Sequence, residues 1–236
     1  MISFPPALAI AASNLDAYRP SVLAGDGEAA AVPEPVEGQR RSQEERSREA
    51  RERLLAAAID VLIRKGYGGL TTKEVAGCAQ MSNGALMHHF VSKEELVAAA
   101  TAAVYQAAVV RGQKRANTAE AAKKPIEGFV TDCLSIYFDW PFIAALEVVI
   151  VARTDPALMA RITPVMEEYR QTVNAIWLKT FVESGMRLER AETVLNLTLN
   201  LIRGMAVNSL WGRNDSLYKQ QLEEWIALMY GTLSTE

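Results

Sequence analysis

The chain has 236 residues, of which 50% are hydrophobic, so it can bury the core of one large domain or of two modest ones. Its formal net charge of −3 means that the chain as a whole is not a polycation, although a locally basic face would still suit DNA. Its uninterrupted apolar runs are shorter than the roughly 20 residues that a membrane span needs. The two cysteines, Cys78 and Cys133, lie far apart inside predicted helices, which favours buried reduced thiols over a redox switch.

Residues 1–41 differ in composition from the rest of the chain. They contain scattered prolines, alanines and glycines without a sustained period, and they lack the basic start of a secretory signal. We expect a disordered extension here, with a misassigned start as the alternative. After residue 41 the composition is rich in alanine and aliphatic residues with few strand-like alternations, which predicts an all-α fold.

Residues 42–65 form the first predicted helix, and Gly66 stands where a left-handed residue commonly ends a helix. Arg51 belongs to a run of alternating arginines and glutamates at the start of this helix. Such a run is either a solvated face with ion pairs or a source of arginines that reach phosphates beside a DNA groove. The apolar face of the helix comprises Leu54, Leu55, Ala58, Ile59 and Leu62.

The stretch 66–93 predicts two short helices joined by a tight turn. Thr71 and Ser92 each precede a glutamate by three residues, which is the spacing of a capping box, and Ser82 is placed to cap the second short helix. Two short helices about a tight turn suit a module that places its second helix in a DNA major groove.

The side chains of these two helices have chemistry that suits DNA. Thr72 and Lys73 begin the first short helix, where free N–H groups and the positive end of the dipole favour a phosphate. On the second helix Asn83 can pair with adenine, Gly84 lets the backbone approach the bases, and Ala85 can pack on a thymine methyl.

His88 and His89 are the only histidines in the chain. Adjacent residues on a helix diverge by about 100°, so this pair does not make a chelating site, and phosphate hydrogen bonds are the better interpretation. We expect neither a metal ion nor a cofactor. Leu86 and Phe90, on the same helix and just after it, are expected in the core.

Three blocks occur in register and without gaps between residues 54 and 96: T-T-K-E-V-A, S-N-G-A-L-M-H-H-F and S-K-E-E-L. This stretch resembles the DNA-binding domain of the tetracycline-repressor (TetR) family. The resemblance implies that Thr72 and His89 hold phosphates and that Lys93 clamps the DNA backbone. It leaves Lys73 to reach either a phosphate or a guanine edge. Met87 stands where the family usually has a tyrosine that helps to hold DNA, and the turn has Gln80-Met81 where Gly-Val is commoner. The predicted DNA-binding set is Arg51, Thr72, Lys73, Ser82, Asn83, Gly84, Ala85, Met87, His88, His89 and Lys93.

The resemblance also implies how the domains are organised. We predict a DNA-binding domain at 42–110, with its helix-turn-helix near 70–89, and a helical ligand-binding and dimerisation domain at 111–236. An alanine-rich helix at 93–115 links the two, and 112–124 is expected to be its frayed end and a loop. Further helices are predicted at 126–140, 142–152, 156–184, 189–211 and 216–233, with a kink or split at Pro164.

The last two predicted helices are apolar over most of their circumference, which suggests one face for the core and another for a partner. In the resembled family these helices pair with their two-fold mates in a four-helix bundle, so we expect a homodimer, with a larger monomeric core as the alternative. The predicted interface residues are Val194, Leu197, Leu201, Met205, Leu222, Trp225 and Met229.

Aromatic and thioether side chains recur along the helices of the second domain. Each one taken alone favours ordinary core packing, but together the family resemblance implies a pocket whose ligand shifts the DNA-binding heads. The candidate pocket residues are Tyr137, Trp140, Phe142, Met159, Met166, Trp177 and Met205. Polar residues near this set, such as Glu147, do not identify a ligand class.

We therefore predict a cytoplasmic, homodimeric transcription regulator that binds a palindromic double-stranded DNA operator. The family's habit favours a repressor, relieved by a small apolar or amphipathic molecule. One alternative is a helical dimer whose DNA-binding head has lost function, which Met87 and the acidic net charge would support. The other alternative is an enzyme, which the chain favours less because it has no phosphate-binding glycine loop, no metal-binding histidine pair and no nucleophile elbow.

Overall fold

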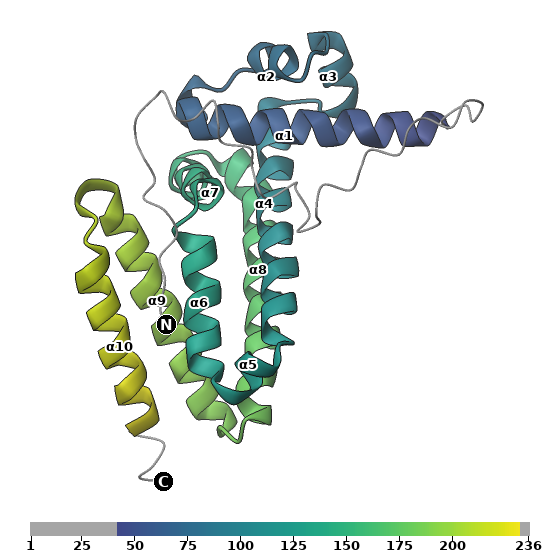
Figure 1. Ribbon diagram of the computed structural model, residues 1–236. Coiled ribbons are helices and arrows are strands. Elements are labelled where there is room, and N and C mark those ends of the chain that lie inside the picture. The colour runs from purple at the N-terminus through teal and green to yellow at the C-terminus, as the bar shows by residue number, and fades with distance from the viewer. Residues whose placement is uncertain (1–41, 232–236) are drawn as a thin grey trace, which may run out of the picture. The chain divides into compact units, whose positions relative to one another are not determined.

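The computed structural model describes residues 42–231, apart from the side chain of Trp140. The described part consists of ten helices and contains no strand, so the predicted all-α fold is confirmed. The extension predicted at 1–41 lies outside the described residues. The helices, labelled in Figure 1, are α1 Gln43–Gly69, α2 Thr72–Cys78, α3 Asn83–His89, α4 Lys93–Ala116, α5 Ala119–Lys123, α6 Pro125–Tyr137, α7 Trp140–Ala152, α8 Pro156–Glu183, α9 Leu188–Gly212 and α10 Asp215–Gly231.

The described chain divides into two compact units. The first, called here the N-terminal unit, comprises 42–104 and 144–165, and the second, called the C-terminal unit, comprises 105–143 and 166–231. Helices α4, α7 and α8 each have residues in both. Residues 144–165 belong to the N-terminal unit although they are distant from it in sequence, and the helical periodicity of the sequence does not predict this. The domain boundaries at 41 and 110 stay predictions.

In the N-terminal unit α2 and α3 pack beside α1 (Figure 1). The core between them is fully apolar, and Leu86 and Phe90 belong to it, as predicted. The three predicted caps are confirmed: the hydroxyls of Thr71, Ser82 and Ser92 accept N–H hydrogen bonds from residues three further on, at 3.1–3.2 Å. The carboxylate halves of the boxes differ from the expectation. Glu74 pairs with Lys65 of α1, and Glu95 accepts the Val91 N–H at 2.9 Å.

For the later helices, the sequence pattern predicts the ends better than the interiors. Asp155 Oδ1 accepts the N–H groups of Ala157 and Leu158, so Asp155 caps α8 ahead of Pro156. We predicted a kink or a split at Pro164. The helix α8 runs on past Pro164, so there is no split, and the kink stays a prediction. The loop predicted within 112–124 is also wrong in part, because Thr118 caps the short helix α5 through the Ala121 N–H at 3.1 Å.

The core of the C-terminal unit contains a buried carboxylate. Trp177 is fully buried among aromatic rings, and its Nε1–H donates to Asp132 Oδ2 at 2.9 Å. Arg115 approaches the other oxygen of Asp132 at 3.6 Å. Removal from water disfavours the charged carboxylate more than these partners favour it, and the pKa of Asp132 rises to about 6.

No single helix of residues 42–231 is long and apolar enough to cross a membrane. One bent pair, Pro125–Tyr137 with Pro141–Ala152, meets that criterion by length and composition only.

The raised pKa of Asp132 makes stability depend on pH in a defined direction. Because the folded-state pKa lies above the ordinary 3.8, the contribution of this group is fully present below about pH 4 and is lost as the pH rises through about 6. We expect the free energy of unfolding of the protein, minus that of Asp132→Asn, to fall by roughly 2 kcal/mol between pH 4 and pH 7. Denaturant titrations of both proteins across this range would measure it, and a difference that does not change with pH would contradict it.

Candidate nucleic-acid interface

The turn between α2 and α3 sets the direction of α3. Gln80 has a φ of 55°, and among the described residues other than glycine it alone has a positive φ. The Gln80 N–H donates to Gly77 O at 3.0 Å and the Met81 N–H to Ala76 O at 2.8 Å, so the turn closes on the end of α2. This left-handed position is where the resembled family more often has glycine, and a glutamine there carries a steric cost of about 1 kcal/mol.

The predicted contact residues on α2 and α3 differ in how far they are exposed. Leu86 is buried on the inner side of α3 and holds the helix to the core. Ser82 Oγ accepts the Ala85 N–H at 3.1 Å, which leaves its own O–H free to donate. The exposed members are Lys73, Ser82, Asn83, Gly84, Met87 and His88, and the half-buried ones are Thr72, Ala85 and His89. Their contacts with DNA stay predictions.

Arg51 is exposed on α1, and its guanidinium carbon lies 4.5 Å from the centroid of the Phe90 ring. This cation–π contact holds the guanidinium near the end of α3. The arrangement is compatible with the phosphate-contact interpretation of Arg51.

Lys93 is held within the protein. Its Nζ donates to Tyr67 O at 2.8 Å and lies 4.1 Å from the centroid of the Tyr67 ring. Partial burial lowers the pKa of Lys93. An ammonium has three donors, so the predicted phosphate clamp requires Lys93 to use a second N–H while the first stays on Tyr67.

The same peptide segment is bound from a distant part of the chain. Glu147 Oε1, on α7, accepts the Tyr67 N–H at 2.8 Å. Gly66 has φ 67° and ψ 179°, and a Cβ built on it would lie 2.6 Å from Glu147 Oε1. The N–H and C=O of Tyr67 are thus both bound by charged side chains. The sequence analysis left Glu147 without a role, and no local pattern points from residue 147 to residue 67.

Some of the candidate pocket residues lie together in the C-terminal unit. The rings of Tyr137 and Phe142 make an edge-to-face pair with centroids 4.5 Å apart. Tyr137 Oη lies 3.3 Å from Tyr169 Oη, Tyr105 stacks on Tyr169 with centroids 4.5 Å apart, and Tyr105 Oη donates to Met166 Sδ at 3.7 Å. The sequence analysis missed Tyr105 and Tyr169, although both are aromatic residues on predicted helices.

The other candidate pocket residues lie elsewhere. Trp177 packs against Phe129 and bonds to Asp132, and Met205 lines a groove on α9 and α10. Met159 belongs to the N-terminal unit, and the side chain of Trp140 lies outside the described part of the structure.

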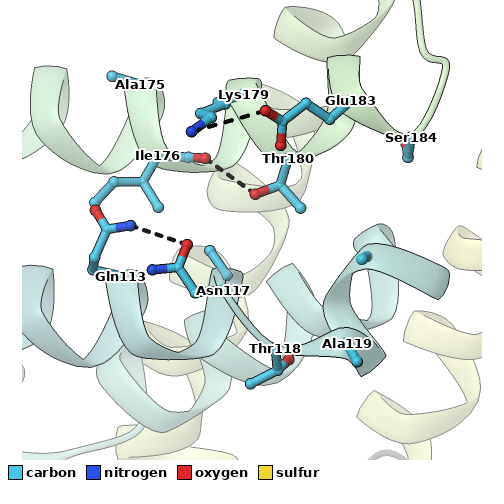
Figure 2. Close-up of a pocket in the computed structure, with 12 residues that line it drawn as sticks. Gln113, Asn117, Thr118, Ala119, Ala175, Ile176, Lys179, Thr180, Glu183 and Ser184 are labelled. Atoms are coloured by element: carbon cyan, nitrogen blue, oxygen red, sulfur yellow. Dashed lines mark hydrogen bonds and ion pairs between the residues drawn. The ribbon is translucent and has the colours of Figure 1, made fainter.

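A separate polar cleft of about 660 Å³ lies between the end of α4, α5 and the end of α8 (Figure 2). Its polar groups largely satisfy one another: Gln113 Nε2 donates to Asn117 Oδ1 at 3.4 Å, and Lys179 lies 3.8 Å from Glu183. None of the candidate pocket residues lines it.

Helices α9 and α10 run side by side, joined by a hydrogen bond from Trp225 Nε1 to Thr198 Oγ1 at 2.9 Å (Figure 1). Of the predicted interface residues, Leu197 is 47% exposed, and Leu201 and Trp225 are half-buried. The remaining four, Val194, Met205, Leu222 and Met229, are buried within their own chain. The exposed apolar residues of these helices that are not among the predicted interface residues are Leu188, Trp211, Leu217 and Leu228.

Comparison with known proteins agrees with this geometry. Residues 54–100 match the family model described as bacterial regulatory proteins, tetR family. The chain is 34% identical over 181 residues to the HTH-type transcriptional regulator CymR of Pseudomonas putida, an alignment that covers 77% of this chain and 89% of that protein.

Two solved structures share the fold. A transcriptional regulator from Saccharomonospora viridis in complex with choline superposes with a TM-score of 0.62 at 21% identity, covering 76% of this chain and 96% of that one. A transcriptional regulator from Rhodococcus sp. Rha1 does so with a TM-score of 0.59 at 23% identity, covering 77% and 94%.

The backbone at Gly66 predicts the effect of adding a single methyl group. Gly66→Ala should destabilise the protein by roughly 1–3 kcal/mol, because this φ and ψ are adopted almost only by glycine and because the new Cβ meets Glu147. Gly68→Ala is the matched control, since a Cβ there meets nothing within 4 Å. Denaturant unfolding of both variants measures the effect, and equal stability of the two would contradict this account.

Proposed function

Since the chain belongs to the TetR family of bacterial regulatory proteins, we propose that this DNA-binding transcription regulator is a homodimeric, cytoplasmic repressor that a small ligand releases from a palindromic operator. The observation that carries the DNA-binding part is the outer surface of α2 and α3. There Lys73, Asn83 and His88 are exposed on two capped helices, while Leu86 anchors α3 from the inner side. Lys73 and His88 suit phosphates, and the Asn83 amide suits an adenine edge in the major groove.

The dimer is supported by the exposed apolar side chains of α9 and α10. Leu197 and Trp211 of α9 are 47% and 74% exposed, and Leu217 and Leu228 of α10 line a groove together with Leu201 of α9. Exposed apolar groups gathered on one pair of helices indicate an interface. A two-fold dimer would present two copies of α3 to two half-sites about one helical turn apart, which is why a palindromic operator follows from it.

Release by a ligand is supported by the tyrosine-rich cluster of the C-terminal unit, described above around Tyr137. Such a protein has one state that binds DNA and one that does not. A ligand that binds the second state more tightly lowers operator affinity, and the loss of binding free energy equals the difference between the ligand's binding free energies for the two states. The choline in the S. viridis structure is a ligand of that protein.

The decisive experiment is selection of bound duplexes from a random DNA pool by the purified full-length chain, followed by sequencing. Enrichment of a palindrome supports the proposed function. Absence of enrichment at low salt, from a folded dimer, would instead favour the degenerate-head alternative. Turnover of a small molecule without DNA binding would favour an enzyme.

Two variants separate base reading from phosphate binding. Asn83→Ala should weaken the free energy of operator binding by about 1–3 kcal/mol, because a bidentate pair with adenine is lost. The base preference at that one operator position should relax. Lys73→Ala should weaken binding to all DNA sequences alike and reduce the slope of the logarithm of the binding constant against the logarithm of salt concentration by about 1. Binding titrations on the selected operator and its single-base variants measure both effects. Uniform weakening by Asn83→Ala would show that Asn83 does not read a base.

The dimer proposal predicts a strong effect at one exposed leucine. Leu197→Arg should raise the dimer dissociation constant roughly 100-fold or more, because it places an unpaired charge in an apolar interface. Val182→Arg, at a similarly exposed apolar residue of α8, is the control and should leave the dimer intact. Sedimentation velocity over a concentration series measures both, and a stable Leu197→Arg dimer would exclude this face as the interface.

A further inference from the structure

Arg203 is a charged residue on the otherwise uncharged middle of α9, between Ile202 and Gly204. It is half-buried, and its Nη2–H donates to Tyr137 Oη at 3.0 Å. Its guanidinium carbon lies 5.0 Å from the centroid of the Tyr137 ring. The side chain is therefore held against the tyrosine cluster of the C-terminal unit.

The surroundings of Arg203 supply no negative charge. Burial raises the pKa of Tyr137, of Tyr169 and of the Cys133 thiol, so all three are neutral at physiological pH. Within residues 42–231 no carboxylate lies within ion-pair distance of Arg203, whereas Arg115 in the same unit has Asp132 at 3.6 Å. A partly desolvated cation without a counter-ion is unfavourable in a folded protein, so its presence calls for an explanation.

We propose that Arg203 binds the carboxylate of the effector, which makes the effector an amphipathic organic acid. This inference rests on the proposed function and narrows its ligand class. The guanidinium has five N–H donors in a planar fork, of which Tyr137 takes one, so a pair of parallel donors remains for a carboxylate. The Tyr137 and Tyr169 hydroxyls extend the polar end of the site, and the buried rings of Phe142 and Tyr105 pack against these tyrosines, so the body of the ligand would displace part of this packing to reach aromatic surroundings.

The first test asks whether Arg203 is structural or kept for a ligand. A structural arginine lowers stability when removed, whereas a cation that awaits an external anion does not. We expect Arg203→Met to melt at the same temperature as the unmodified protein or higher in the absence of ligand. Arg115→Met is the control and should melt lower, because it leaves the buried Asp132 carboxylate without its cation. A fall for Arg203→Met as large as that for Arg115→Met would overturn the proposal.

The second test uses matched ligand pairs with the full-length protein. The probes are monocarboxylic acids with short aliphatic or aromatic bodies, each paired with its primary amide, assayed by thermal shift and by titration calorimetry. We expect one or more acids to raise the melting temperature and their amides not to. Arg203→Met should weaken acid binding roughly tenfold or more, with Arg203→Lys intermediate because it keeps the charge without the fork.

The outcomes separate this inference from the proposed function. Amides that bind as well as acids, acid binding unaffected by Arg203→Met, or no acid binding at all would each overturn the carboxylate anchor. Release of the selected operator by amides as readily as by acids would leave the ligand-responsive repressor standing and remove this inference alone. If no operator is selected although acids bind through Arg203, the proposed repressor function is contradicted and the carboxylate anchor stands.

Discussion

The two helices that face the predicted DNA surface have seven residues each, too few to stay helical in water without outside support. Everything that α2 and α3 present therefore depends on capping and on burial against α1. The hydroxyls of Thr71 and Ser82 satisfy N–H groups at their starts, and Val75 and Leu86 are fully buried on their inner sides. Because the inner side chains of these helices are buried in the core, the outer side chains are the ones accessible to DNA.

The entry to this helix pair is held by side-chain contacts to the backbone N–H and C=O of one residue, Tyr67. The end of regular α1 at Gly66 needs a backbone that glycine adopts readily, and the following residue, Tyr67, has its N–H bound by Glu147 and its C=O by Lys93. These side chains come from α7 and α4, both of which also have residues in the C-terminal unit.

The C-terminal unit contains two charged side chains whose situations are opposite. Asp132 is buried with an indole N–H and an arginine close by, so its cost of burial is shared among protein groups. Arg203 contacts the hydroxyl and the ring of Tyr137, and no carboxylate in the described part of the chain pairs with it. Groups of the first kind have protein partners that offset part of the cost of burial, whereas a group of the second kind has no partner of opposite charge among the described residues.

The sequence by itself determined the helical class, the helix-turn-helix, the caps at Thr71, Ser82 and Ser92, and the family. These depend on residues within a few positions of one another, where periodicity and capping chemistry are legible. Only the tertiary structure decided that Glu147 binds Tyr67, 80 residues away, and that Arg203 meets Tyr137 across 66 residues. It also decided which apolar residues of α9 and α10 stay exposed, as Leu197 does, and which, like Val194, are buried in their own chain. Helical spacing groups such residues on a face, but only the packing of neighbouring helices determines which of them that packing covers.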